Sequence, residues 1–270
     1  MRRWAPVAHL FYVIPLLLLF QLAPGCPSDV TAPCYTAATV VNSATNQPLL
    51  APNGMATIYG AFLSFSTKAL TPADLSGGML PVRLPGTGVT VLIDGWAAPV
   101  WYVSPGQINF QVPSNLRGGQ EVSLVVARDG KAGPTVTVRL AEESPGLYAA
   151  DPETAIAVRL DGSVISRQQP ARRGEILLLF ANGLGRTVPD TPYRMTPLSA
   201  APIAKLSEFR VLLNGIELTP DRVPYVGAVP GFAGLYQINV MVPEDAPEMP
   251  EIQVRIGSAV SPRALRLPLR

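Results

Sequence analysis

The chain has 270 residues, of which 48% are hydrophobic and 15% are charged, and it contains 29 prolines and 23 glycines. This composition excludes a disordered chain and favours short strands separated by turns. Without Arg2 and Arg3, the 21 basic residues fall to 19 and equal the 19 acidic ones. A neutral chain gives no electrostatic reason to expect nucleic acid or an anionic membrane as a partner.

The first 25 residues have the pattern of an export signal. Arg2 and Arg3 supply the positive start, Leu10 to Leu22 form an apolar stretch, and small residues precede Cys26. The apolar stretch has about 13 residues, fewer than the roughly 20 that a membrane-spanning helix needs. We therefore predict a cleaved signal peptide over residues 1–25, no transmembrane segment, and an exported protein that is extracellular, periplasmic or at the cell surface.

The two cysteines of the sequence, Cys26 and Cys34, lie in the predicted exported segment 26–38. They support two alternatives. Residues 22–26, LAPGC, resemble a lipoprotein cleavage box in which Cys26 carries a lipid anchor, although Ala23 and Pro24 match such a box poorly. In an oxidising compartment, a disulfide joins Cys26 to Cys34 instead. The disulfide is favoured, because lipidation leaves Cys34 as a lone exposed thiol.

A pattern that occurs twice sets the organisation of the chain. Residues 89–113 and 209–243 each contain an apolar run, a turn dipeptide, a second run that reaches Tyr-Val, and a final segment with Gln-Ile-Asn and Val-Pro. The turn dipeptides are Asp94-Gly95 and Asn214-Gly215. They suit tight hairpins, because these residue types adopt positive φ. Each copy is therefore predicted to form strand, turn, strand, loop and strand.

The register of the two copies indicates an internal duplication. The separation between Gly54 and Gly174 equals the separation between Gly95 and Gly215. A chain of this length suits two domains of roughly 100 residues each. We predict an all-β fold with two tandem β-sandwich domains, at residues 39–143 and 144–270. Since no Ser- or Gly-rich linker separates them, we expect them to pack closely or to exchange an edge strand.

The second copy contains an insertion between Tyr225 and Gln237. Its Gly and Pro content is typical of a loop rather than a strand. We therefore predict that residues 226–235 form a loop at the surface. Phe232, in the middle of this loop, is a candidate ligand contact.

The repeated Gln-Ile-Asn segment has the alternation of a half-buried strand. Ile108, Phe110 and Val112 are predicted to face the core, which places Gln107 and Asn109 on the other face together with their counterparts Gln237 and Asn239. These amides either line a ligand site or hydrogen-bond to the backbone of the neighbouring long loop. The structural interpretation is favoured, because two loops of different length would hardly build the same ligand site.

Several long motifs carry a resemblance to a known family. They are VNSATNQPLLAPNGMATIYGAFLS, DGWAAPVWYVSPGQINFQVP, SPGLYAADPETAIAV, PARRGEILLLFANGLG and GFAGLYQINVMVP. Together they resemble the uncharacterised C-terminal module family of secreted acidobacterial (Solibacter-type) proteins, over residues 39–270. The resemblance implies an exported module related to the IPT/TIG immunoglobulin-like domains, with no established activity and no catalytic residues. In this chain the module follows the signal almost directly, whereas the family's modules usually end larger proteins.

The residue inventory argues against catalysis. The one histidine, His9, lies in the predicted signal, which excludes Ser-His-Asp and Cys-His sites and the common histidine-ligated zinc sites from the mature chain. We expect neither a metal nor a cofactor. Three groups of carboxylates are interpreted as solvated loop charge rather than as a catalytic pair or a calcium site. They are Glu142-Glu143, Asp151 with Glu153 and Asp161, and Glu244-Asp245.

Aromatic side chains are the remaining route to function. Trp101 is predicted to fill the core, whereas Trp96 follows the turn at Gly95 and is a second candidate ligand contact. The sequence therefore predicts an exported, non-catalytic structural or adhesive module whose partner is a cell-surface protein or a glycan. A carbohydrate-binding module is the alternative. A glycoside hydrolase that uses two carboxylates is a distant third.

Overall fold

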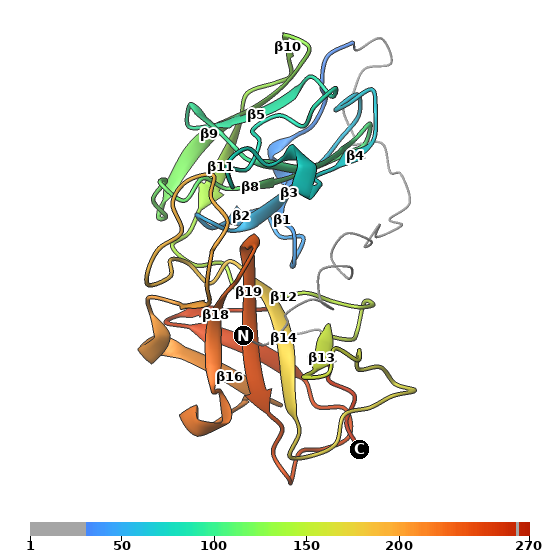
Figure 1. Ribbon diagram of the computed structural model, residues 1–270, viewed down its shortest axis with the longest axis vertical. Helices are drawn as coiled ribbons and strands as arrows, with labels where there is room; N and C mark the ends of the chain where they lie inside the picture. The colour runs from blue at the N-terminus through green and yellow to red at the C-terminus, as the bar shows by residue number, and fades with distance from the viewer. Residues whose placement is uncertain (1–30, 263–264) are drawn as a thin grey trace.

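The computed structural model describes residues 31–262 and 265–270. The predicted signal peptide, residues 1–25, and Cys26 lie outside the described residues. Figure 1 shows two β-sheet bodies, one above the other along the long axis. In the described part of the chain, no helix is long and apolar enough to cross a membrane. The helical elements there are single turns of 3-10 helix: η1 (Ala37–Thr39), η2 (Pro72–Asp74), η3 (Leu206–Glu208) and η4 (Pro220–Arg222).

The upper body is a sandwich of two sheets. One sheet has the order β1-β3-β8-β7-β4, with the strands β1 (Val40–Asn42), β3 (Met55–Tyr59), β8 (Gln107–Gln111), β7 (Val100–Ser104) and β4 (Lys68–Ala69). The other has the order β2-β11-β9-β5-β6, with the strands β2 (Leu49–Leu50), β11 (Val136–Leu140), β9 (Gln120–Arg128), β5 (Val89–Ile93) and β6 (Trp96–Ala97), and β10 (Lys131–Ala132) pairs with β9.

Alternation along the strands builds the core of this first sandwich. In β5, Val89, Val91 and Ile93 are fully buried and the two residues between them are half-buried. Ile108 and Phe110 of β8 are fully buried on the facing sheet, as the sequence predicts. Burial of each such side chain contributes roughly 1.5–3 kcal/mol. Trp101 packs against this core but stays half-buried.

The lower body is a second sandwich with the same design. Its larger sheet has the order β12-β14-β19-β18-β15, with the strands β12 (Gly146–Leu147), β14 (Ile176–Asn182), β19 (Phe232–Met241), β18 (Tyr225–Val229) and β15 (Ala201–Pro202), and β13 (Ala157–Arg159) pairs with β14. Its smaller sheet has the order β17-β16-β20-β21, with the strands β17 (Ile216–Glu217), β16 (Phe209–Leu213), β20 (Ile252–Ile256) and β21 (Ala259–Val260).

The two bodies are tandem β-sandwiches whose strand orders agree with an internal duplication. The strand order β1-β3-β8-β7-β4 of the first corresponds to β12-β14-β19-β18-β15 of the second. The hairpins β5–β6 and β16–β17 turn at Asp94-Gly95 and Asn214-Gly215, whose φ angles are 49° and 78° in one and 49° and 79° in the other. Positive φ at both residues is the geometry expected of such hairpin turns.

The insertion of the second half is not the surface loop that the sequence predicts. Residues 225–229 and 232–241 are the paired strands β18 and β19, which turn at Pro230-Gly231. Most of the hairpin is buried, and Ala233 belongs to the core cluster of the first sandwich. One of its glycines, Gly227, serves close packing, because a Cβ there would lie 2.2 Å from the carbonyl oxygen of Ala201. Gly227 is therefore needed for close contact, whereas Gly231, with a φ of 82°, lies in the turn.

Candidate functional site

The junction between the sandwiches is organised around the buried side chain of Asn182, at the end of β14. Its Nδ2 donates to the carbonyl oxygen of Met55 at 2.7 Å and to Oδ1 of Asn42 at 2.8 Å. Its Oδ1 accepts from the backbone N–H of Met55 at 2.8 Å. Asn42 in turn donates to the carbonyl oxygen of Ser144 at 2.9 Å. One side-chain amide thus bonds to both backbone groups of Met55, at the start of β3, across the junction.

A second buried group crosses the junction beside the first. Tyr236 of β19 donates to the carbonyl oxygen of Gly185, and its oxygen accepts from Nδ2 of Asn53 at 3.3 Å. Oδ1 of Asn53 accepts from Gln111 at 2.7 Å. Burial raises the pKa of the Tyr236 hydroxyl, so this group stays protonated. Because both networks are buried and connected, they hold the two sandwiches as one rigid unit.

Close backbone contact completes the junction at Gly183, where φ is 71°. A Cβ there would lie 2.0 Å from the carbonyl oxygen of Ser144, so only glycine fits. The same glycine accepts through its carbonyl oxygen from the backbone N–H of Ser144 at 2.9 Å. The chain passes from the first sandwich to the second at this contact.

The long loop at residues 183–200 extends from the second sandwich onto the first. The backbone N–H of Leu80 donates to the carbonyl oxygen of Arg194 at 2.7 Å, and Nε of Arg194 donates to the carbonyl oxygen of Leu80 at 3.0 Å. Met79 and Met195 form an antiparallel bridge. The loop is therefore fixed to the first sandwich through its backbone.

This loop brings Tyr193 to the predicted contact residue Trp96. The two rings meet edge to face, with centroids 5.6 Å apart and an interplanar angle of 75°. The Tyr193 hydroxyl donates to the carbonyl oxygen of Ala97, which fixes the tyrosine ring. Such edge-to-face pairs are a favoured aromatic geometry. Nothing in the sequence indicated Tyr193, because its partner lies about a hundred positions earlier.

These residues form what we call the Trp96 surface: Met79, Trp96, Tyr193 and Met195. Trp96 is 46% exposed and Met79 is 41% exposed. Both sandwiches contribute to this surface, so it exists only when they are joined. Aromatic and methionine side chains that remain exposed on a rigid support are typical of contact surfaces.

Phe232, the other predicted contact residue, begins β19. It is half-buried and packs against a separate apolar cluster on the outer face of the larger sheet. That cluster contains Ile156, Val158, Leu178, Phe180, Val229 and Leu235. The structure therefore does not bring Phe232 together with Trp96.

The Gln-Ile-Asn amides hydrogen-bond to each other rather than to a neighbouring loop. Gln107 donates to Oδ1 of Asn109 at 2.8 Å, and Gln237 donates to Oδ1 of Asn239 at 2.6 Å. Side chains two positions apart share a face of a strand, so each pair bonds within its own strand, and Thr57 of β3 also donates to Oδ1 of Asn109 at 3.2 Å. The predicted partner was wrong, although the recurrence of one pairing in both halves agrees with a structural role.

Members of two of the three acidic clusters take part in turns and ion pairs. Glu143 and Lys205 pair at 2.9 Å, and this hydrogen bond raises the pKa of Lys205. The backbone N–H of Glu153 donates to Asp151, which lowers the pKa of that carboxyl group. The backbone N–H of Ser163 donates to Asp161 and lowers the pKa of that carboxyl group as well. Over residues 31–262 and 265–270, no group of three His, Cys, Asp or Glu side chains is placed to hold a metal ion.

Cys34 is disulfide-bonded. Cys26, the other cysteine of the sequence, lies outside the described residues, so its role stays a prediction. The backbone of Cys34 exchanges two hydrogen bonds of 2.9 Å with Ala61. A Cβ on the neighbouring Gly60 would lie 2.3 Å from the carbonyl oxygen of Cys34. The segment around Cys34 is therefore held tightly against the first sandwich.

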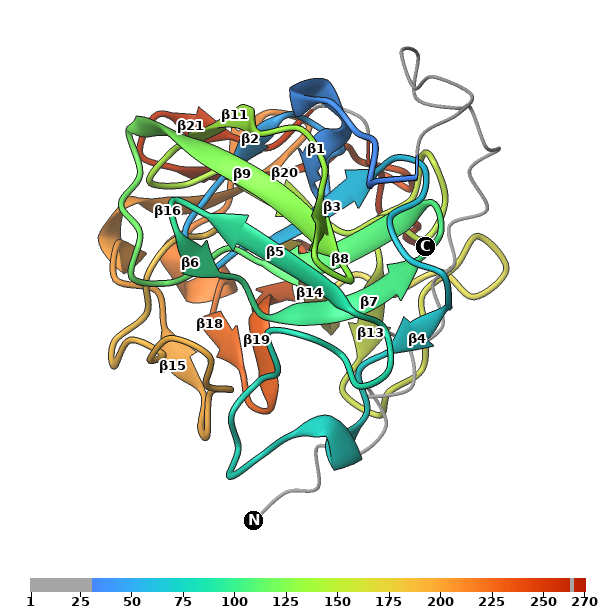
Figure 2. The same cartoon turned by 90° about the horizontal axis from the view of Figure 1, so that it is seen from above.

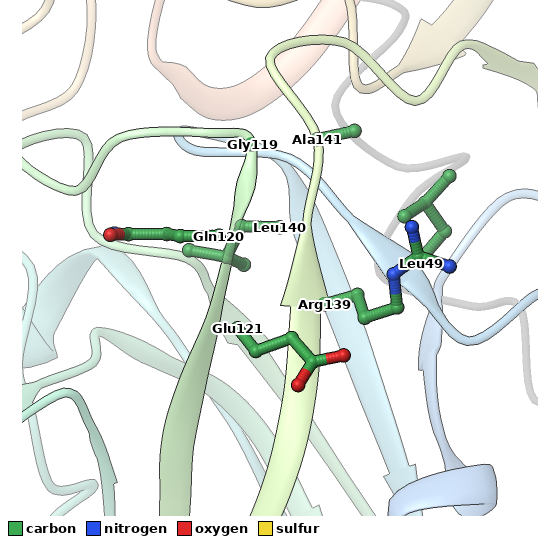
Figure 3. Close-up of a pocket in the computed structure, with 7 residues that line it drawn as sticks. All are labelled: Leu49, Gly119, Gln120, Glu121, Arg139, Leu140 and Ala141. Carbon is green, nitrogen blue, oxygen red and sulfur yellow. The ribbon is translucent and has the colours of Figure 1, made fainter.

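An open hollow of about 350 Å³ lies beside β2, β11 and β9 (Figure 3). Glu121 and Arg139 are exposed at its edge, opposite each other in the strand register. In Figure 3 the side chains of Gln120 and Arg139 point in different directions. Ligand sites have polar groups that converge on one point, and this hollow does not.

No protein-family model matches the chain, and no curated protein does. Solved structures with a related arrangement include the surface glycan-binding protein SGBP-B of the Bacteroides ovatus mixed-linkage glucan utilization locus, with 10% identity, 83% of this chain and 44% of that chain covered, and a TM-score of 0.33. The I9–I11 tandem of titin has 10% identity, with 85% and 65% covered and a TM-score of 0.25.

The surface glycan-binding protein PbSGBP-B of Prevotella bryantii has 11% identity, with 91% of this chain and 43% of that chain covered, and a TM-score of 0.27. The chain thus spans less than two thirds of each of these structures. Identities and TM-scores this low do not extend the likeness to function.

Proposed function

We propose that the chain is an exported, non-catalytic adhesive module whose contact is made by the Trp96 surface. The observation that carries the proposal is the position of Trp96: it is 46% exposed although Tyr193 of the other sandwich is fixed against its edge. A large aromatic ring that is held in place but left open to solvent loses little conformational entropy when it binds.

The rigid junction supports this function. An adhesive contact transmits force along the module, and a flexible joint would let the two sandwiches turn independently. The Asn182 and Tyr236 networks connect the sandwiches through buried hydrogen bonds. Both sides of the Trp96 surface therefore keep their relative position when a partner pulls on one of them.

The test is a binding panel with the mature chain, its Trp96→Ala variant and an Ile216→Ala control. Ile216 is an apolar residue that is 72% exposed on the second sandwich, far in sequence from Trp96. Binding to immobilised extracellular proteins and polysaccharides is measured by biolayer interferometry. We expect Trp96→Ala to weaken the strongest interaction about tenfold or more and Ile216→Ala to leave it unchanged. Equal effects of the two substitutions would contradict the proposal.

Carbohydrate binding is the second candidate, because the Trp96 ring offers an apolar face of the kind that a sugar ring stacks on. A glycan array separates the two functions. Selective retention of polysaccharides, without release of reducing sugar, supports a carbohydrate-binding module. Retention of proteins alone supports the adhesive function.

A further inference from the structure

The two ends of the molecule differ in shape. The upper end of the first sandwich, which we call the distal end, carries the loop at residues 60–67 between β3 and β4 and lies next to β10 (Figures 1 and 2). Two phenylalanines project from this loop: Phe62 is 42% exposed and Phe65 is 74% exposed. We call this pair the Phe65 knob. A ring as exposed as Phe65 has no role in the core of the sandwich.

A buried arginine supports the knob from below. Arg128, at the end of β9, lies with its guanidinium carbon 3.7 Å from the centre of the Phe65 ring. Its Nη1 donates to the carbonyl oxygen of Phe62, and its Nη2 donates to that of Thr31 at 2.5 Å. One cation therefore fixes both the ring and the loop backbone, in a cation–π contact with a buried charge.

The loop backbone is held in an unusual conformation. Phe62 has a φ of 56°, in the left-handed region that bulky residues seldom adopt. Such conformations persist where the surroundings determine them, and they gather at functional positions. Here the surroundings are Arg128 and the segment around Cys34, which pairs with Ala61. The knob is thus presented rigidly rather than on a flexible loop.

The opposite end of the molecule carries an open depression. A hollow of about 370 Å³ lies at the lower end of the second sandwich, near the marked C-terminus in Figure 1. Its lining combines the apolar residues Pro170, Met249, Pro268 and Leu269 with the charged residues Arg167, Glu248 and Arg270. We call it the terminal hollow. Its volume is large enough for a phenyl ring. The Phe65 knob, which presents such a ring, lies at the far end of the same molecule.

The internal duplication adds a second reason to relate these two ends. Strands β3 and β14 correspond, and β14 ends at the junction, where the first sandwich covers it. The equivalent end of β3 lies at the distal end of the first sandwich. The distal end therefore corresponds to the end of the second sandwich that the first sandwich covers, but it lacks such a neighbour. If the arrangement within the chain is repeated between copies, the distal end is covered by the lower end of the second sandwich of another copy.

We propose that the mature chain self-associates head to tail, with the Phe65 knob of one copy inserted in the terminal hollow of the next. The knob and the hollow lie at opposite ends, so one molecule cannot satisfy both by itself. A contact of this kind is heterologous and leads to open chains of molecules. The proposal does not depend on the Trp96 surface.

Sedimentation equilibrium of the mature chain over a range of concentrations tests the proposal, with circular dichroism as the check on folding. We expect mass to increase with concentration in the parent. Phe65→Ala, at the knob, and Met249→Lys, in the hollow, should each raise the dissociation constant about tenfold or more. Leu198→Ala, which removes an exposed apolar residue from the loop at residues 183–200 near the junction, should leave it unchanged.

Mixing the two defective variants makes the test specific. Phe65→Ala retains an intact hollow and Met249→Lys retains an intact knob, so an equimolar mixture should form dimers and stop there. A mixture that stays monomeric would overturn the proposal, as would a parent that is monomeric at every concentration. If Phe65→Ala instead abolishes flotation of the parent with phosphatidylcholine vesicles while no self-association is seen, the knob contacts lipid and the proposal is wrong.

Discussion

Replacing Asn182 with alanine is the sharpest test of how the two sandwiches are coupled. The substitution leaves the backbone N–H of Met55 without its acceptor, whereas the carbonyl oxygen of Met55 still accepts from Ser43 and Oδ1 of Asn42 still accepts from the N–H of Ala44. A buried polar group that loses its partner costs about 1–3 kcal/mol. One group is stranded in this way, so we expect a loss of about 1–3 kcal/mol in the free energy of unfolding.

Two optical signals distinguish the sandwiches in this experiment. Trp96 and Trp101 both lie in the first sandwich, and Trp4 belongs to the predicted signal peptide, so tryptophan fluorescence of the mature chain reports on that sandwich. Far-ultraviolet circular dichroism reports on both. During urea unfolding of the parent we expect the two curves to coincide, because the sandwiches unfold as one cooperative unit. For Asn182→Ala we expect a lower midpoint and two curves that separate.

Asn239→Ala is the matched control, since it removes the same kind of side chain from the same sheet. It leaves Nε2 of Gln237 without this acceptor, which lowers the free energy of unfolding by about 1–3 kcal/mol through a contact within one sandwich. The two curves should still coincide. If Asn182→Ala unfolds with the midpoint of the parent, or if its curves coincide as those of Asn239→Ala do, then the junction network does not couple the domains and the reasoning is refuted.

Two further predictions follow from the junction and the core. Deletion of residues 228–233 should abolish cooperative unfolding, because it removes Ala233 from the first core and breaks the β18–β19 pairing; a melting temperature within a few degrees of the parent would contradict this. Burial raises the pKa of Tyr35 to about 12, above its usual 10.0. Its contribution to stability is therefore complete below pH 10 and is lost as pH rises through 12. Tyr35→Phe should lower the urea midpoint at neutral pH and flatten its decline above pH 10, whereas parallel pH profiles would show that another group titrates.

Local patterns were predicted correctly where the physical cause is local. Asp94-Gly95 and Asn214-Gly215 form the expected hairpin turns because positive φ depends on the residues themselves. Ile108 and Phe110 face the core because alternation along a strand decides which face a side chain takes. The duplication was visible for the same reason, since two copies of one local pattern produce two sandwiches with one strand order.

The sequence predicted Trp96 of the candidate site but not Tyr193, because Tyr193 is distant from Trp96 in sequence. Trp96 follows a turn, and its exposure could be suspected from that position. Tyr193 reaches it from a loop of the other sandwich, and Asn182 bonds to Asn42 across 140 positions. Residue types and spacing within one segment carry no information about such partners. The same limit explains the wrong partner for the Gln-Ile-Asn amides, where the nearer group on the same strand competed successfully with the loop.

The β18–β19 hairpin shows how a correct observation can have two physical causes. Glycine and proline in the insertion suggested a loop, since both residue types are common in turns. Gly231 does lie in the turn, with a φ of 82°. Gly227 and Gly234 have a different function, because a Cβ on either would meet Ala201 or Met55 at less than 3.0 Å. Composition alone does not separate flexibility from close packing.

The differences between the halves have a common consequence. The second half has the longer loop, residues 183–200 against 60–67, and the longer hairpin at β18–β19. Both additions extend to the first sandwich: the loop through Tyr193 and Arg194, and the hairpin through Ala233. A duplication alone yields two similar domains on a string, whereas these two extensions and the Asn182 network join them. The Trp96 surface lies at the boundary that they create. The divergence of the second half therefore produced both the rigid junction and the surface through which we expect the module to bind.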